Sequence, residues 1–178
     1  MKKLLLLLAV VVAFSAYSQD RPLSFSEVIP VEGKTQAEIY GGLREWVATS
    51  YVNAKAVTQM EDAQSATIIL KALFPFKKGG FYIAYTGQVD YMIKLQAKDG
   101  RFRVEMSQMS HSVKPGNHAG SALGLLTTAE EYGKGGLSKG AHNKIWKQLK
   151  EKSKEQFDEL AASLKQLKTF NASVEEEW

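Results

Sequence analysis

The chain has 178 residues, 44% of them hydrophobic and 24% charged, which is the composition of an ordinary globular protein. It has no cysteine, so a disulfide scaffold, a thiol nucleophile and a thiolate metal site are excluded. The formal charge is +4, but only 21 basic and 19 acidic residues remain without Lys2 and Lys3, and a charge of +2 argues against nucleic-acid binding.

The N-terminus has the layout of a secretory signal peptide. Two lysines precede an apolar run at residues 4–14, and Ala16-Tyr17-Ser18 places small residues before Gln19. We therefore predict a signal peptide at residues 1–18. A retained anchor is the alternative, but the run is too short for a bilayer core of about 30 Å. No cysteine follows it, so a lipoprotein is excluded, and the expected location is the periplasm or the medium, in soluble form.

A strand and then a helix are predicted next. Residues 23–31 mix apolar and polar side chains in an order compatible with a strand, which stops at Gly33. Thr35 and Glu38 form a capping box, which marks the first turn of a helix. The apolar residues that follow recur at helical spacing and predict one buried stripe. They are Ile39, Leu43, Trp46 and Val47.

Three strands follow in the prediction. Two of them, residues 54–60 and 66–74, are separated by turn residues at 61–65. The third, residues 81–97, is the clearest element of the chain. Its odd-numbered residues are apolar and its even-numbered residues include the polar ones, and this strict alternation predicts a strand with one buried face and one face in water. Asp99-Gly100 then predicts a tight hairpin turn.

In the strand after this turn, the residues expected to face the core change from even-numbered to odd-numbered positions. Val104 and Met106 are even-numbered, whereas Met109 and His111 are odd-numbered. A regular strand cannot exchange its two faces, so we predict a β-bulge near Ser107-Gln108.

The C-terminal part combines a loop with a long helix. Residues 115–140 are glycine-rich and are predicted to be a loop or insertion, with a short helix at 123–132 as one option. An amphipathic helix is predicted over residues 139–168, and residues 171–178 form an acidic tail.

These elements predict the order β-α-β-β-β-β-α. Short connections favour an antiparallel sheet, here of about five strands, and two amphipathic helices need one apolar sheet face to cover. The expected fold is a two-layer α+β sandwich within one domain at residues 19–170, and its second sheet face is open.

No catalytic or metal-binding motif is complete. Gly33-Lys34-Thr35 resembles the end of a phosphate-binding loop, but Val28 replaces the required glycine, so Thr35 is interpreted as a helix cap. The histidines lack metal-ligand spacing. We predict no cofactor, no metal site and no catalytic residue, with His111 as a structural strand residue and His118 and His142 in or beside the loop.

Several segments resemble a known family. Residues 25–35, Glu38-Ile39-Tyr40 and Glu45-Trp46 resemble the opening of the exported bacterial proteins called domain-of-unknown-function family 4468, and residues 98–103 resemble its central strands. The resemblance covers roughly residues 25–113. It implies a TBP-like fold, in which a curved antiparallel sheet is backed by two helices. It brings no activity, cofactor or catalytic residue.

The function predicted from these features is a non-catalytic binding or interaction module of the bacterial cell envelope. Its partner would be an envelope protein or a small ligand that contacts the open sheet face. That face is expected to carry Tyr82, Thr86, Gln88, Asp90, Met92, Lys94 and Gln96.

Two other functions stay open at this point. An enzyme acting on an envelope substrate would use His118 or His142 as its acid or base. DNA binding is suggested by the TBP-like name, but fold does not carry function, and export and the low charge oppose it.

The glycine-rich loop is also expected to fold Leu123, Leu125 and Leu126 over the open face, unless a partner covers it.

Overall fold

The computed structural model describes residues 20–113, 116, 119–133 and 138–167. The predicted signal peptide and acidic tail lie outside these residues. The elements in chain order are β1 (Phe25–Pro30), α2 (Gln36–Ser50), α3 (Ala54–Val57), β2 (Thr58–Asp62), β3 (Thr67–Phe76), the 3₁₀ helix η1 (Gly80–Tyr85), β4 (Gly87–Lys98), β5 (Arg101–Val113), the 3₁₀ helix η2 (Ala119–Ser121), β6 (Gly124–Leu125) and α4 (Lys139–Lys165).

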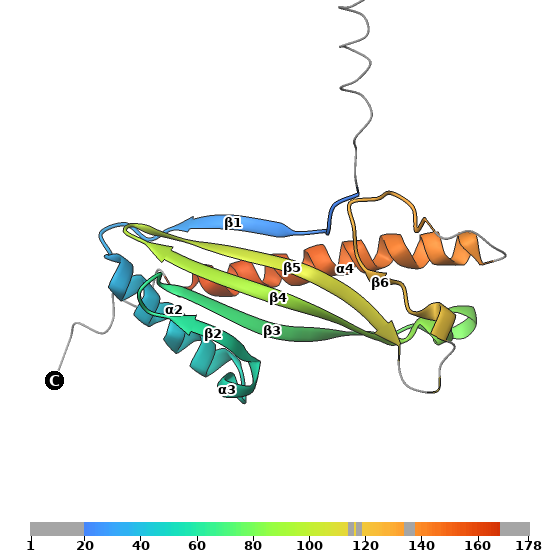
Figure 1. Cartoon of the computed structure of the whole chain (residues 1–178), viewed down its shortest axis with the longest axis horizontal. Coiled ribbons are helices and arrows are strands. Elements are labelled where there is room, and N and C mark those ends of the chain that lie inside the picture. The colour runs from blue at the N-terminus through green and yellow to red at the C-terminus, as the bar shows by residue number, and fades with distance from the viewer. Residues whose placement is uncertain (1–19, 114–115, 117–118, 134–137, 168–178) are drawn as a thin grey trace, which may run out of the picture.

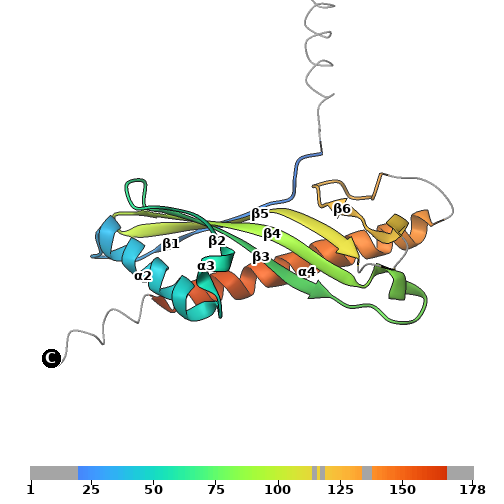
Figure 2. The same ribbon diagram turned by 60° about the horizontal axis from the view of Figure 1, so that its bottom comes forward.

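The strands form one antiparallel sheet in the order β1-β5-β4-β3-β2, and the short β6 also pairs with β5. β1 and β6 bond successive parts of β5, residues 101–106 and 110–111. Helices α2 and α4 pack on the same side of this sheet, with α4 running along its length (Figures 1 and 2). The predicted two-layer α+β fold is therefore confirmed, with β6 as a strand beyond the expected five.

The helix layer is joined to itself and to the sheet by specific contacts. The Trp46 indole of α2 donates a hydrogen bond of 3.0 Å to the Ser163 hydroxyl of α4. Phe157 of α4 packs on Phe25 of β1, with ring centroids 5.6 Å apart. The four residues of the predicted stripe in α2 are all buried. This layer covers one face of the sheet along its length.

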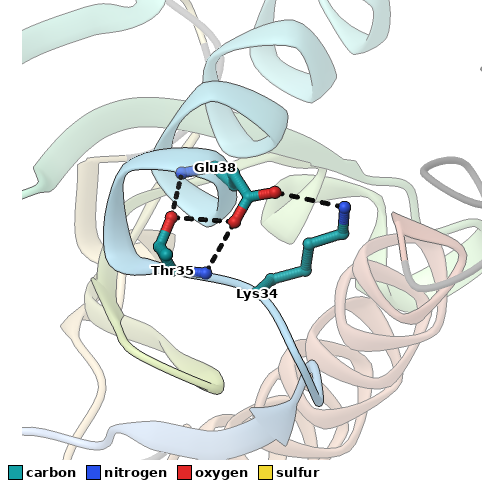
Figure 3. A network of polar contacts seen from close by, with 3 residues as sticks. All are labelled: Lys34, Thr35 and Glu38. Atoms are coloured by element: carbon teal, nitrogen blue, oxygen red, sulfur yellow. Dashed lines mark hydrogen bonds and ion pairs between the residues drawn. The ribbon is translucent and has the colours of Figure 1, made fainter. Parts of the chain in front are cut away.

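The start of α2 is held by the predicted capping box (Figure 3). The Thr35 hydroxyl accepts the backbone N–H of Glu38 at 3.3 Å, and the Glu38 carboxylate accepts the backbone N–H of Thr35 at 2.8 Å. Lys34 adds an ion pair of 3.2 Å to the same carboxylate. The hydrogen bond from the Thr35 backbone, with that from its hydroxyl and the nearby Lys34, lowers the pKa of Glu38 to about 2.

Two expected strands begin later than the sequence predicted. Residues 54–57 form the one-turn helix α3, because the Asn53 side chain accepts the backbone N–H of Ala56 and caps it. Residues 80–85 form η1 after Gly80 turns the chain at φ +57°. The alternating side chains of η1 imitate a strand in the sequence, yet Phe81 and Ile83 are exposed.

The predicted bulge lies in β5 at Gln108. Asp90 pairs with Ser110 and Met92 pairs with Ser107, so two residues of β5 oppose the single Tyr91 of β4. Gln108 has φ +54°, and the parity of the buried side chains changes there. The extra residue keeps apolar side chains against the helices on both sides of the bulge.

The loop before α4 contributes to the core, contrary to the expectation that it covers the open face. Residues 123–132 hold β6 instead of a helix. Leu123, Leu126 and Tyr132 are buried in the same cluster as the helix stripes. The reason is the pairing of β6 with β5, which fixes the backbone so that these side chains point to the helix side. Of the three leucines expected on the open face, Leu125 is the exposed one.

Candidate functional site

The open face of the sheet is the candidate functional site. Along β4 the odd residues from Val89 to Ala97 are buried, whereas Gln88, Asp90, Met92 and Lys94 are half-exposed on the other side. Helices α2 and α4 lie on the opposite side of the sheet, against the buried residues (Figure 2). The structure therefore places these four predicted residues together on one surface, and Gln96 continues their row.

Tyr82 and Thr86 were wrongly predicted to lie on this strand face. Tyr82 belongs to η1, where its ring lies 4.9 Å from the Lys144 ammonium of α4, on the helix side. Thr86 precedes β4, and its hydroxyl bonds the backbone N–H and C=O of Lys78 at 2.9 and 3.0 Å. Because η1 replaces the first third of the expected strand, neither residue extends the β4 row.

Neighbouring strands extend the open face sideways. Register places Leu73 of β3, Asp90 of β4, Ser110 of β5 and Leu125 of β6 in one row. The Gln88 amide donates to the Asp90 carboxylate at 3.3 Å, which keeps this acid within a polar pair. The face thus combines polar groups at its centre with apolar side chains toward its edges.

Exposed hydrophobic side chains gather on this face. The structure has seven exposed large hydrophobic residues in its described part, and four of them lie here by register. They are Val28 (55% exposed), Met60 (41%), Leu73 (53%) and Leu125 (46%). A gathering of apolar side chains on one wet surface is typical of an interaction site.

A groove of about 350 Å³ lies where the β4–β5 hairpin meets β1 and the first turn of α2. We call it the hairpin groove. Its polar and apolar walls include Val28, Gln36, Gln96, Lys98, Arg101 and Arg103. The sequence analysis did not select the three cations. Their positions either side of the Asp99-Gly100 turn are the only feature of the sequence that could have indicated them.

The two histidines in the described part of the chain, His111 and His142, both pack against aromatic rings. His111 is buried, and His142 lies between the rings of Tyr85 and Tyr132, with centroids 5.8 and 5.3 Å away. His118 lies outside the described residues. No group of three or more His, Cys, Asp or Glu side chains suited to a metal ion occurs among the residues described.

Lys34 and Thr35 act in the helix cap and not in a phosphate loop. Both are bonded to Glu38. The first backbone N–H of α2, that of Gln36, is occupied by the Asp99 carboxylate at 2.7 Å. The end of α2 that a phosphate would need is therefore already filled by side chains of this chain.

The fold and this surface define a two-layer α+β protein with one open face on an antiparallel sheet. The family described as "Domain of unknown function (DUF4468) with TBP-like fold" matches residues 25–112, from β1 almost to the end of β5. The resemblance to this family that the sequence predicted is therefore confirmed over these residues. No curated protein matches the chain.

Two solved structures share the fold. A DUF4468 family protein from Bacteroides ovatus is 16% identical, covers 80% of this chain and 86% of its own, and has a TM-score of 0.52. A TBP-like protein from Parabacteroides distasonis is 13% identical, covers 84% of this chain and 96% of its own, and has a TM-score of 0.55. At these identities the likeness concerns the fold alone.

None of the helices in the described part of the chain is long and apolar enough to span a membrane.

Proposed function

We propose that the protein is an exported, non-catalytic binding module of the bacterial cell envelope, and that its open face holds the partner. The observation that carries the proposal is the gathering of four exposed large hydrophobic residues on the face that the helices leave uncovered. Gln88, Asp90 and Lys94 supply polar groups between them. A surface with an apolar and a polar part suits a specific protein partner.

Export is supported by the N-terminal sequence. Two lysines, a short apolar run and small residues before Gln19 are the features that a signal peptidase requires. Mass spectrometry of the protein from its native cells should find a mature chain that begins at Gln19. Recovery of the chain with residues 1–18 attached would contradict export by cleavage.

Binding through the open face is tested by capture from envelope extract. The triple variant Gln88→Ala/Asp90→Ala/Lys94→Ala removes the polar centre of the face without touching the core. A matched control, Lys154→Ala/Gln156→Ala/Asp158→Ala, removes the same three residue types from the solvent side of α4, away from this face. The wild type and the control should retain the same partner, and the triple variant should lose it. Equal capture by all three proteins would contradict the proposal.

The alternative enzyme function has less support. His142 is half-buried, with its ring against those of Tyr85 and Tyr132, which limits the access of a substrate to it. A general acid or base must reach the reacting group directly or through one water molecule. A turnover found by screening and lost in His142→Gln would favour the enzyme over the binding module.

A further inference from the structure

We propose that the hairpin groove binds a short acidic peptide segment of a partner protein, with glutamate or aspartate side chains on its cations and an aliphatic side chain on Val28. The inference rests on the proposed function, because the groove forms one end of the open face. It adds the chemistry of the partner and the residues that recognise it.

Two of the three cations of the groove, Lys98 and Arg101, lack an ion-pair partner among the described residues. Lys98 and Arg101 are exposed on either side of the hairpin turn, and neither makes an ion pair with any residue in the described part of the chain. Asp99 lies between them in sequence, but its carboxylate accepts the backbone N–H of Gln36 at 2.7 Å. The acid closest in sequence is thus engaged with α2, and the two cations remain available to an anion.

Arg103 adds a third cation in a fixed position. One terminal nitrogen of its guanidinium lies 3.3 Å from the Glu105 carboxylate on the same strand. A guanidinium has five N–H donors, so this pair leaves donors for a second carboxylate. The pair orients the arginine side chain along the open face.

The remaining groove residues match a peptide better than a bare anion. Register places Gln96, Arg103 and Val28 in one row across β4, β5 and β1. The Gln96 amide carries both donors and an acceptor, which is the combination that a peptide group requires. Val28 is 55% exposed and offers apolar contact beside the cations. An inorganic anion would use neither the carbonyl oxygen of Gln96 nor Val28.

The residues that line the groove argue against an anionic membrane and against nucleic acid as its ligand. Clusters of 4–8 basic residues are typical of lipid-binding segments, whereas this groove has three cations, one of them already paired. Single-stranded nucleic acid is bound by basic grooves with aromatic platforms, and the only aromatic residue of the groove, Phe102, is buried in the core. A few carboxylates with an aliphatic neighbour fit the groove more closely.

The test is an NMR titration of the purified chain with a blocked six-residue peptide of alternating glutamate and valine. The matched peptide has glutamine in place of glutamate. Lys98→Gln/Arg101→Gln removes the two unpaired cations, and Lys55→Gln/Lys147→Gln removes two exposed lysines elsewhere. The acidic peptide should shift the amides of β1 and of the β4–β5 hairpin. The groove variant should lose about tenfold or more in affinity, and the control variant should keep it.

Several results would overturn the inference. These are equal binding of the two peptides, equal loss in both double variants, no binding of either peptide, or retention on phosphatidylglycerol vesicles that the acidic peptide does not compete away. The proposed function is judged separately by capture from envelope extract. If Gln88→Ala/Asp90→Ala/Lys94→Ala loses its partner while Lys98→Gln/Arg101→Gln keeps it, the acidic-peptide inference fails and the binding module stands.

Discussion

The backbone N–H of Leu123 donates a hydrogen bond of 3.2 Å to Nδ1 of His111 inside the core. A backbone N–H can only donate, so Nδ1 accepts and the ring proton lies on Nε2, which donates to the Tyr85 carbonyl at 3.1 Å. The neutral imidazole therefore joins β5 to η1 and to the loop before β6. This side chain links the loop to β5 in addition to the pairing of β6 with β5.

Replacing His111 should alter how stability depends on pH. Burial lowers the pKa of His111, although its hydrogen bond to Tyr85 opposes this effect. Just below pH 6.5 the unfolded chain therefore takes up a proton that the folded chain does not, and stability falls as the pH falls. Urea unfolding between pH 7.5 and 5.5 should show a larger loss for the wild type than for His111→Gln. Parallel curves would show that the histidine does not titrate in this way.

Two neighbouring leucines should differ strongly in their contribution to stability. Leu126 is fully buried, so Leu126→Ala should cost about 2–5 kcal/mol of unfolding free energy. Leu125 is 46% exposed on the open face, and Leu125→Ala should cost about 0.5 kcal/mol or less. Chemical denaturation of both variants checks the pair. Similar small effects would mean that the loop is not part of the core.

The capping box predicts how much stability a Thr35 variant loses and over which pH range the Glu38 carboxylate contributes to stability. Thr35→Ala should cost about 1 kcal/mol, while Thr35→Ser keeps the accepting hydroxyl and should cost less. The pKa of Glu38 is lowered to about 2, so its contribution is present above about pH 4.5 and is lost as the pH falls toward 2. When stability is measured as the pH is lowered, Glu38→Gln should lack the part of the stability loss that protonation of Glu38 causes in the wild type. An identical acid transition in the two proteins would contradict the role of the carboxylate.

Replacement by alanine should change stability in opposite directions at two glycines. A Cβ at Gly87 would collide with the backbone carbonyl of Ser112 on β5, so Gly87→Ala should destabilise the sheet by several kcal/mol or prevent folding. A Cβ at Gly42 meets open space in the middle of α2, and Gly42→Ala should raise stability by about 1 kcal/mol. Thermal unfolding of both variants measures the contrast. A tolerated alanine at Gly87 would show that β4 and β5 separate at this end.

The parts of the fold that could be predicted are those whose cause lies within a few residues. The Thr35 and Glu38 box, the alternation along β4 and the parity change at Gln108 all have local physical origins, and each is present in the structure. One error has a distant cause: Phe81 and Ile83 alternate as in a strand, but no strand in the described part of the chain pairs with them. The other error is local, because the Asn53 cap makes a helical turn of residues 54–57, which were expected in a strand.

The candidate site was predictable only in its central strand. Gln88, Asp90, Met92 and Lys94 follow from the period of two in β4. Leu73 and Leu125 join their row through the register of three strand pairs, which the sequence does not reveal. The same limit applies to the hairpin groove, because Val28 meets Arg103 only through the pairing of β1 with β5.

Site-specific photo-crosslinking in the native cells tests the central claim most directly, namely that the open face is the surface that holds a partner. A benzophenone amino acid is placed at Met92, in the middle of that face, or at Lys147, on the solvent side of α4. The account predicts a discrete adduct from position 92 and none from position 147. Adducts at position 147 with none at position 92 would show that the helix layer, and not the open face, meets the partner.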